Sequence, residues 1–314
     1  MGLEIKENIL LAPYTIYKIG GPAKFFTEVT NAGELKEALE FAAQKKIPFF
    51  ILGGGSNVLI SDRGFDGLIV RMAGGDIKTD GQRLGADAGA IMVRAVNEAA
   101  RAGLAGFEWA AGIPGTIGGS VRGNSGCFGG EMKDVVESVG IFDVNNAKSF
   151  ELKNADCNFG YRDSVFKKRP EWIIVSVVFK LQKGDPAEIQ KKIEKIQKER
   201  NEKQDIGTKS SGCIFKNISW QRKDINKEKL IRRLPELENF RDKPNIPASL
   251  LIDRAGLRGY RIGNARISEK HANFFINDGN ALAEDIIKLI NVAKDTVKKK
   301  FGIVLEEEIR YVGF

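Results

Sequence analysis

Histidine and cysteine are scarce in this chain, and their scarcity excludes several kinds of active site. The single histidine is His271, so metal sites built from several imidazoles are excluded, and any Ser/His/Asp triad would have to use that residue. The three cysteines, Cys127, Cys157 and Cys213, form no CxxC pair. We therefore expect three reduced thiols, with neither a disulfide framework nor a cysteine-rich zinc site.

Long apolar runs are also missing. No stretch of roughly eighteen apolar residues occurs, and the N-terminal sequence lacks the basic, apolar and small-residue order of a signal peptide. We expect a cytoplasmic protein without membrane insertion. Of the 314 residues, 42% are hydrophobic and 29% are charged, which is typical of a globular protein that folds without disulfides.

Positive charge is in excess, with 49 Lys and Arg against 41 Asp and Glu, a net charge of +8. A nucleic-acid-binding protein would interleave aromatic residues with a basic patch, but the lysine-rich stretch 183–203 contains no aromatic residue. We predict no nucleic-acid partner. The charge instead favours electrostatic steering of anionic small molecules.

The spacing of apolar residues predicts an α+β protein with several domains. Short apolar runs predict strands at 24–29, 47–52, 57–61, 135–144, 172–181 and 303–312. A helical period predicts helices after Asn31 and at 92–103, 183–205 and 282–301. Their expected buried stripes are Leu35, Ala38, Leu39 and Ala42; Val93, Val96 and Ala100; Ile189, Ile193 and Ile196; and Leu282, Ile286, Leu289, Ile290, Ala293 and Val297. In the last strand Glu306, Glu308 and Arg310 would share one face.

Two glycine-rich loops are candidates for a cofactor site. The segment 51–60 (ILGGGSNVLI) places adjacent glycines after a buried strand, where backbone N–H groups can approach an anion such as pyrophosphate. It is neither a GxGxxG fingerprint nor a P-loop, and alone it could be a simple strand connection. The second loop, 110–132 (AAGIPGTIGGSVRGNSGCFGGEM), offers mainly backbone dipoles, as a flavin and its diphosphate would require.

Five further motifs accompany these loops: TIYKIGGPAKFF before them, and GYRDSVFK, SSGCIFKN, AGLRGYRIGNARISEKHANFFIN and LEEEIRYVG after them. Together the loops and motifs resemble the UDP-N-acetylenolpyruvoylglucosamine reductase family of bacterial peptidoglycan synthesis, and they appear in that family's order. The spacing between Arg162 and Trp172 resembles the shorter subclass, which lacks a tyrosine-bearing insertion. Uridine contacts therefore cannot be assigned.

The resemblance implies a two-lobed FAD-binding module of the vanillyl-alcohol-oxidase (PCMH) type at 15–183, with lobes of about 1–71 and 72–183. It further implies a charged connecting helix at 184–205, a smaller α+β substrate domain at 206–300, and a C-terminal strand at 301–314 that returns to the flavin lobes. Because Cys127 is the only thiol in the loops and His271 lies outside them, we expect FAD to be non-covalent. The implied FAD contacts are Gly53, Gly54, Gly55, Ser56, Asn57, Gly112, Ile113, Pro114, Gly115, Gly118 and Gly119.

The catalytic residues that the resemblance implies are Arg162, Glu308 and Cys213. A guanidinium fork suits a substrate carboxylate, and Cys213 stands where the family usually has a serine as proton donor. A free thiol is a stronger acid than a serine hydroxyl, so it can donate a proton, although Ser210 or Ser211 would be the donor if the register is displaced. Tyr161, Lys203 and Asn217 match substrate-binding positions, and the match of Lys203 requires a gap.

The reaction that the resemblance implies is ping-pong: NADPH reduces FAD, and UDP-N-acetylglucosamine-enolpyruvate then takes a hydride at its terminal carbon. Arg162 and Glu308 would stabilise the enolate, and Cys213 would protonate it. No obligate protein partner is expected. The alternative is an FAD-dependent oxidase of the same fold that uses O₂.

Overall fold

The computed structural model describes residues 2–314, which form two compact units. Unit 1 contains residues 2–10, 22–56 and 64–202, and unit 2 contains residues 11–21, 57–63 and 203–314. Each unit combines helices and strands, so the predicted α+β class is confirmed. None of the helices described between residues 2 and 314 has the length and apolar character that a membrane crossing requires.

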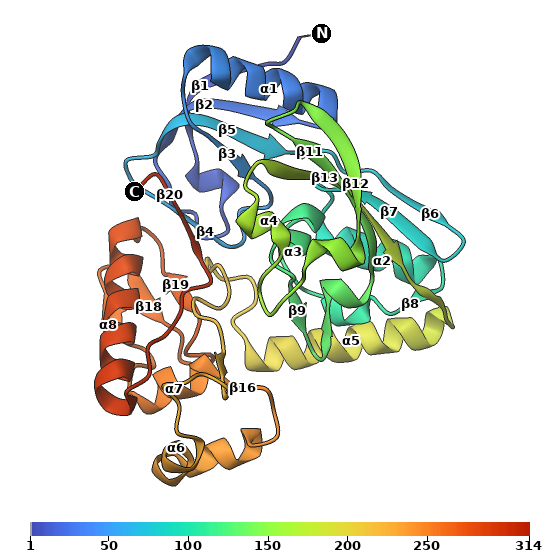
Figure 1. Ribbon diagram of the computed structural model, residues 1–314. Coiled ribbons are helices and arrows are strands. Elements are labelled where there is room, and N and C mark those ends of the chain that lie inside the picture. Colours follow the sequence, from blue (N-terminus) through green and yellow to red (C-terminus); the bar gives the residue numbers. More distant parts are fainter. Residues whose placement is uncertain (1) are drawn as a thin grey trace. The chain divides into compact units, whose positions relative to one another are not determined.

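The first sheet of unit 1 has the strand order β1-β2-β5-β3, with β5 parallel to both β2 and β3 (Figure 1). Leu68, Ile69 and Val70 of β5 are all fully buried, as is typical of a central strand in a parallel arrangement. The bounds are β1 Lys6–Leu10, β2 Pro22–Val29, β3 Phe49–Leu52 and β5 Phe65–Met72. The strands predicted at 24–29 and 47–52 are therefore confirmed.

Helix α1 (Ala32–Lys45) begins where the sequence predicts. The Asn31 side chain accepts a hydrogen bond from the backbone N–H of Glu34 at 3.0 Å, which satisfies one of the unpaired donors of the first turn. The Glu34 carboxylate accepts in return from the N–H of Thr30 at 2.7 Å. The four predicted apolar positions of this helix are all buried.

The second sheet of unit 1 is antiparallel, with the order β12-β11-β13-β7-β6. The bounds are β6 Ile77–Asp80, β7 Arg83–Asp87, β11 Val136–Asp143, β12 Lys148–Lys153 and β13 Trp172–Lys180. The strands predicted at 135–144 and 172–181 are thus confirmed. Shorter elements complete the unit: β8 Leu104–Ala105, β9 Gly126–Cys127, β10 Gly130–Glu131, β14 Gln182–Lys183, η2 Glu108–Ala110, η3 Met132–Asp134, η4 Asn154–Cys157, α3 Ile117–Arg122 and α4 Val165–Lys168.

Two further helices of unit 1 follow their predicted patterns with one correction each. In α2 (Met92–Arg101) Val93 is 40% exposed, because the buried stripe is centred one position earlier, on Met92, and Val93 lies at its edge. In α5 (Pro186–Lys203) Ile189 and Ile193 are buried as expected and Ile196 is half-buried against the core, but Arg200 is buried as well. The charged face of α5 is therefore not entirely solvated.

Unit 2 contains one three-stranded sheet, two strand pairs and three α-helices. The sheet has the order β17-β18-β19 and packs against α8, while β15 pairs with β16 and β4 pairs with β20. The bounds are η1 Ala12–Tyr14, β4 Val58–Ile60, β15 Ile218–Ser219, α6 Lys227–Arg233, η5 Pro235–Phe240, β16 Asn245–Ile246, α7 Ala248–Arg254, β17 Arg261–Ile262, β18 Ala265–Ile267, β19 Phe275–Asn277, α8 Ala283–Phe301 and β20 Arg310–Val312. The predicted strand 57–61 is confirmed as β4.

The end of the chain differs in detail from the prediction. Leu282 precedes α8 and is 52% exposed, so it is not part of the buried stripe, whereas Gly302 ends the helix with a φ of 76°, as expected. Only Arg310–Val312 form regular strand. Ile303, Leu305 and Ile309 are buried as predicted, but the alternation is interrupted at Glu307 and Glu308, which are both half-buried. This strand runs parallel to β4, so segments about 250 residues apart in sequence pair directly.

Candidate functional site

The two glycine-rich loops lie in direct contact within unit 1. A Cβ atom on Gly54 would lie 2.7 Å from Cα of Gly115, and a Cβ on Gly53 would lie 2.5 Å from Oγ1 of Thr116. Gly115 has a φ of 105°, and a Cβ there would lie 2.4 Å from Oγ of Ser56. Since side chains cannot be accommodated at such distances, the close approach of the two loops requires glycine.

A third segment, residues 88–92, lies against the second loop. None of the motifs in the sequence points to it. The N–H groups of Ile117 and Gly118 donate to the carbonyls of Ala90 and Ala88 at 2.9 and 2.8 Å. The N–H of Met92 donates back to the carbonyl of Gly115 at 3.1 Å. The only local signal for this segment is its run of small residues, which allows the backbones to approach each other.

Most of the other predicted cofactor residues lie in unit 1, on the second loop and at the start of α3. They are Gly112, Ile113, Pro114, Gly118 and Gly119. Asn57 belongs to unit 2, where its side chain donates to the carbonyl of Glu308 at 3.1 Å and its own carbonyl accepts from the N–H of Arg310 at 3.1 Å. Asn57 therefore braces the C-terminal strand.

Arg162 is held at the far end of the second loop. Its Nη2 donates to the carbonyl of Gly126 at 2.7 Å, and its Nη1 donates to the carbonyl of Asn124 at 3.4 Å. The backbone of Arg162 has a φ of 52°, and its own carbonyl accepts from Nζ of Lys167 at 2.6 Å. The ring of Tyr161, which is 43% exposed, lies 5.5 Å from the guanidinium carbon. Two predicted site residues thus share one turn of unit 1.

Cys213 and Glu308 lie on neighbouring segments of unit 2. The N–H of Glu308 donates to the carbonyl of Ile214 at 2.7 Å, one residue after the thiol. On the other side, the N–H of Ile214 donates to the carbonyl of Asn273 at 2.9 Å. The segment of Cys213 is thus held between two other parts of unit 2, one of which carries Glu308, about 95 residues further along the sequence.

Lys203 and Asn217 are also in unit 2 but have different local roles. Lys203 is the exposed last residue of α5. The Asn217 side chain accepts a hydrogen bond at 3.1 Å from the N–H of Ala248, the first residue of α7. Asn217 therefore stabilises the start of that helix.

The two residues considered for covalent flavin attachment are both engaged in protein contacts. Cys127 Sγ donates to the carbonyl of Trp109 at 2.9 Å and accepts from Nη2 of Arg200 at 3.0 Å, and burial raises the pKa of the Cys127 thiol despite the nearby guanidinium. His271 packs on Phe274 with ring centroids 4.6 Å apart, and burial lowers the pKa of its imidazole. His271 thus packs within unit 2.

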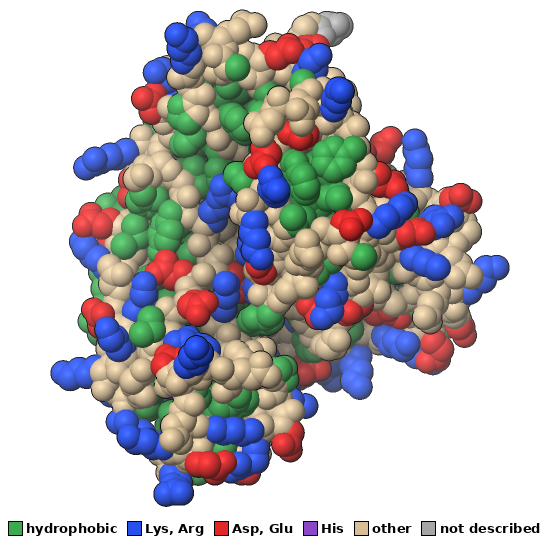
Figure 2. Space-filling view, in the orientation of Figure 1, with side chains coloured by type: hydrophobic (Ala, Val, Ile, Leu, Met, Phe, Trp, Pro, Cys, Tyr) green, Lys and Arg blue, Asp and Glu red, His purple; other side chains and the backbone are tan. Residues whose placement is uncertain are grey.

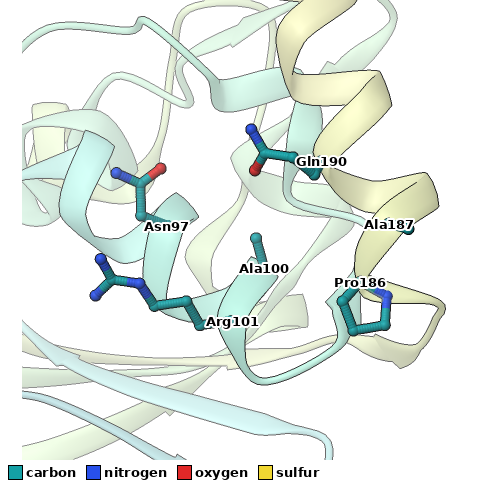
Figure 3. A pocket seen from close by; sticks show the side chains of 6 residues that line it. All are labelled: Asn97, Ala100, Arg101, Pro186, Ala187 and Gln190. Atoms are coloured by element: carbon teal, nitrogen blue, oxygen red, sulfur yellow. The ribbon is translucent and has the colours of Figure 1, made fainter.

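A separate cavity of about 540 Å³ opens between α2 and α5 in unit 1 (Figure 3). It is lined by Asn97, Ala100, Arg101, Pro186, Ala187 and Gln190. None of these residues was predicted to bind cofactor or substrate. Among residues 2–314, no three His, Cys, Asp or Glu side chains are grouped so that they could hold a metal ion.

Comparison with known proteins identifies the family. Residues 23–152 match the FAD binding domain family, and residues 203–312 match the C-terminal domain of UDP-N-acetylenolpyruvoylglucosamine reductase. The UDP-N-acetylenolpyruvoylglucosamine reductase of Caldanaerobacter subterraneus subsp. tengcongensis is 39% identical over 301 residues, which cover 96% of this chain and 91% of that relative. The chain belongs to the UDP-N-acetylenolpyruvoylglucosamine reductase family.

Other members of this family are similar to this chain over nearly its whole length. The reductase of Caldicellulosiruptor bescii is 39% identical over 315 residues, covering 99% of this chain and 92% of the relative. The crystal structure of the reductase from Thermus caldophilus has 32% sequence identity, a TM-score of 0.77 and 99% coverage of both chains. The reductase family that the sequence motifs resemble is thereby confirmed.

The residues of the two loops fit an FAD. Their closely packed backbones leave no room for side chains, so a diphosphate could approach backbone N–H groups. Oγ1 of Thr116, between the loops, is buried and has no hydrogen-bond partner among residues 2–314, which is unusual for a buried hydroxyl. The one carboxylate of the second loop, Glu131, is paired with Lys133 at 2.5 Å, which limits its repulsion of a phosphate.

The contact between the loops makes a testable prediction about flavin content. Gly54→Ala should yield protein with at most about a tenth of the FAD per chain of the wild type, because its Cβ would force the loops apart. Gly85→Ala in β7 is the matched control, since a Cβ there would lie 3.9 Å from its nearest neighbour. The measurement is the ratio of flavin to protein absorbance after purification. A Gly54→Ala variant with full flavin content would contradict the assignment.

Proposed function

We propose that this chain reduces the enolpyruvyl group of UDP-N-acetylglucosamine-enolpyruvate to give UDP-N-acetylmuramate for peptidoglycan synthesis. The observation that carries the proposal is the presence, in one chain and in order, of an FAD binding domain and the C-terminal domain of this reductase family. NADPH would be the reductant. An FAD-dependent oxidase of the same fold is not favoured, because the match at 203–312 is specific to the reductases.

The flavin module would correspond to the loops and sheets of residues 15–183, with the substrate domain at 206–300. Gly53, Gly54, Gly55, Ser56 and the residues of the second loop would hold the cofactor. Bound FAD would carry a hydride from NADPH to the terminal carbon of the enolpyruvyl group. The rest of the chemistry concerns the negative charge that this addition leaves next to the substrate carboxylate.

Arg162 is proposed to bind that carboxylate and to stabilise the charge that develops beside it. Two backbone carbonyls, of Asn124 and Gly126, hold the guanidinium in one orientation. A fixed cation stabilises a developing anion without reorganisation during the reaction, which is the main advantage of a preorganised site. The guanidinium fork also matches the geometry of a carboxylate better than an ammonium does.

Cys213 is proposed to protonate the carbon next to the carboxylate, and Glu308 is proposed to help stabilise the enolate. The support is their placement: the backbone of Glu308 hydrogen-bonds to Ile214, next to the thiol. Ser210 and Ser211 would be the donors if the register of the motif is displaced; both residues are buried. Tyr161, Lys203 and Asn217 are proposed to contact the substrate.

The surface charge is consistent with small anionic substrates and does not suggest a nucleic acid. On the face shown in Figure 2, Lys and Arg side chains are interspersed with Asp and Glu side chains and do not form a continuous basic patch. The net charge of +8 would still favour the approach of NADPH and of a UDP-sugar. We propose that the protein acts in the cytoplasm without an obligate protein partner.

A steady-state assay tests this function. The purified protein should oxidise NADPH only when UDP-N-acetylglucosamine-enolpyruvate is present, with one equivalent of UDP-N-acetylmuramate formed per NADPH. NADPH oxidation that instead consumes O₂ in equal amount and leaves the enolpyruvyl compound unchanged would support the oxidase alternative.

A further inference from the structure

Asn124 is a fully buried polar residue next to the proposed carboxylate-binding arginine. Its backbone has a φ of 43°, in the left-handed region that asparagine adopts more readily than most residues. It follows α3 and lies on the second glycine-rich loop, four residues after Ser120 and two before Gly126. Its sequence context alone predicts no role for it.

The Asn124 side chain joins its own segment to two others in unit 1, the segment of Glu131 and Lys133 and the turn that begins at Gly160. Its Nδ2 donates to Oε2 of Glu131 at 2.6 Å and to the carbonyl of Gly160 at 2.9 Å, and its Oδ1 accepts from the N–H of Lys133 at 3.0 Å. Both amide donors and the amide oxygen are thus used. Only an uncharged amide can make these three bonds, because a carboxylate has no donor and would face the carboxylate of Glu131.

One of these side-chain bonds, to Gly160, leads to Arg162, and the backbone carbonyl of Asn124 makes a second connection to that residue. Gly160 begins the turn that carries Arg162, and it exchanges backbone hydrogen bonds with Asp163 at 2.9 and 3.1 Å. The carbonyl of Asn124 accepts from Nη1 of Arg162, while Gly126, two residues further along the same loop, accepts from Nη2. Asn124 therefore holds both the base of the turn and the tip of the side chain.

We propose that Asn124 is the positioning residue for Arg162, and that it fixes the direction in which the guanidinium meets the substrate carboxylate. The proposal rests on the proposed function, in which Arg162 binds that group. A displacement of about 1 Å at a reacting group can lower the rate about 10²-fold, so a residue that only holds the arginine can have a large effect. Asn124 itself does not contact substrate in this account.

The informative variant is Asn124→Gly. Glycine adopts the φ of 43° without strain and keeps the backbone carbonyl that accepts from Arg162, so only the side-chain connections are lost. We expect kcat for enolpyruvyl reduction to fall by a factor of ~10 to 10², with KM changed by less than about threefold, as when stabilisation of the transition state alone is lost. Reduction of FAD by NADPH should keep its rate.

Asn154→Ala is the matched control. The Asn154 amide donates to the carbonyls of Lys133 and Val136 at 2.9 and 2.7 Å, so the variant also loses two side chain to backbone bonds in unit 1. Neither bond involves the turn of Arg162. The kcat of Asn154→Ala should stay close to the wild-type value. The midpoint of thermal unfolding of each variant, followed by flavin fluorescence, shows whether Asn124→Gly has merely lost stability.

A double-mutant cycle separates positioning from a general structural effect. If Asn124 acts through Arg162, then Asn124→Gly should lower kcat by less than about threefold in an Arg162→Lys background. An equal loss in both backgrounds, or a wild-type kcat for Asn124→Gly, would overturn the proposal. A wild-type protein that fails to reduce the enolpyruvyl substrate would contradict the proposed function itself, and with it this role of Asn124.

Discussion

Cys213→Ala is expected to lower the rate of enolpyruvyl reduction by a factor of ~10² to 10⁴, as when a positioned acid is removed. Cys213→Ser should remain clearly active, because the family resemblance implies a serine hydroxyl as the donor at this position. Reduction of FAD by NADPH should barely change in either variant, since that half-reaction needs no acid at this position. Stopped-flow measurement of the two half-reactions checks the prediction.

Thiol alkylation provides a second measurement on the same residue. Burial raises the pKa of the Cys157 thiol to about 12 and also raises that of Cys127, so the thiolate fractions of both are small at neutral pH. We expect alkylation of Cys213 to inactivate the wild type, and bound substrate to protect the enzyme from this inactivation. The Cys213→Ser variant should keep its activity under the same treatment. An alanine variant as fast as the wild type would remove Cys213 from the mechanism and leave Ser210 or Ser211 as the donor.

Arg162→Lys is expected to lower turnover of the enolpyruvyl substrate by about 10²-fold, because the ammonium keeps the charge but loses the planar fork. The lysine also cannot make both bonds to the carbonyls of Asn124 and Gly126 that orient the guanidinium. Reduction of FAD by NADPH should change far less. The two half-reactions are measured separately to establish the difference.

The control for this prediction is Arg169→Lys. Arg169 is an exposed residue of the same unit, and its guanidinium lies 3.4 Å from Oε1 of Glu171. A surface ion pair of this kind contributes little to the stability of the fold. The Arg169→Lys variant should therefore leave the rates of both half-reactions unchanged. An Arg162→Lys variant that loses both half-reactions equally would indicate a flavin contact or misfolding and would argue against a role at the carboxylate.

The elements of this fold could be predicted where the sequence carries a clear local period. Helix α1 shows this well, since its start at Asn31 and all four buried positions follow from capping and spacing. The edge of a stripe is harder to place, and Val93 and Leu282 were wrongly taken as buried. For Val93, a small rotation of the helix decides between solvent and core, and tertiary packing rather than periodicity sets that rotation. Leu282 is exposed for a different reason, since α8 begins after it, at Ala283.

Contacts between distant segments could not be predicted from local patterns. The pairing of β20 with β4, the packing of Ala88 and Ala90 against the second loop, and the burial of Arg200 all depend on how the chain returns to itself. The grouping of Cys213 with Glu308 was available only from the family resemblance. Asn124 was missed because a single asparagine in a glycine-rich loop has no pattern that separates a turn residue from a positioning residue.

The most direct test of the account is an anaerobic titration of the purified protein, which should be yellow. One equivalent of NADPH should bleach the flavin absorbance, and UDP-N-acetylglucosamine-enolpyruvate added afterwards should restore it while one equivalent of UDP-N-acetylmuramate forms. A flavin that NADPH bleaches but that only O₂ re-oxidises would contradict the central claim that this chain is an enolpyruvyl reductase.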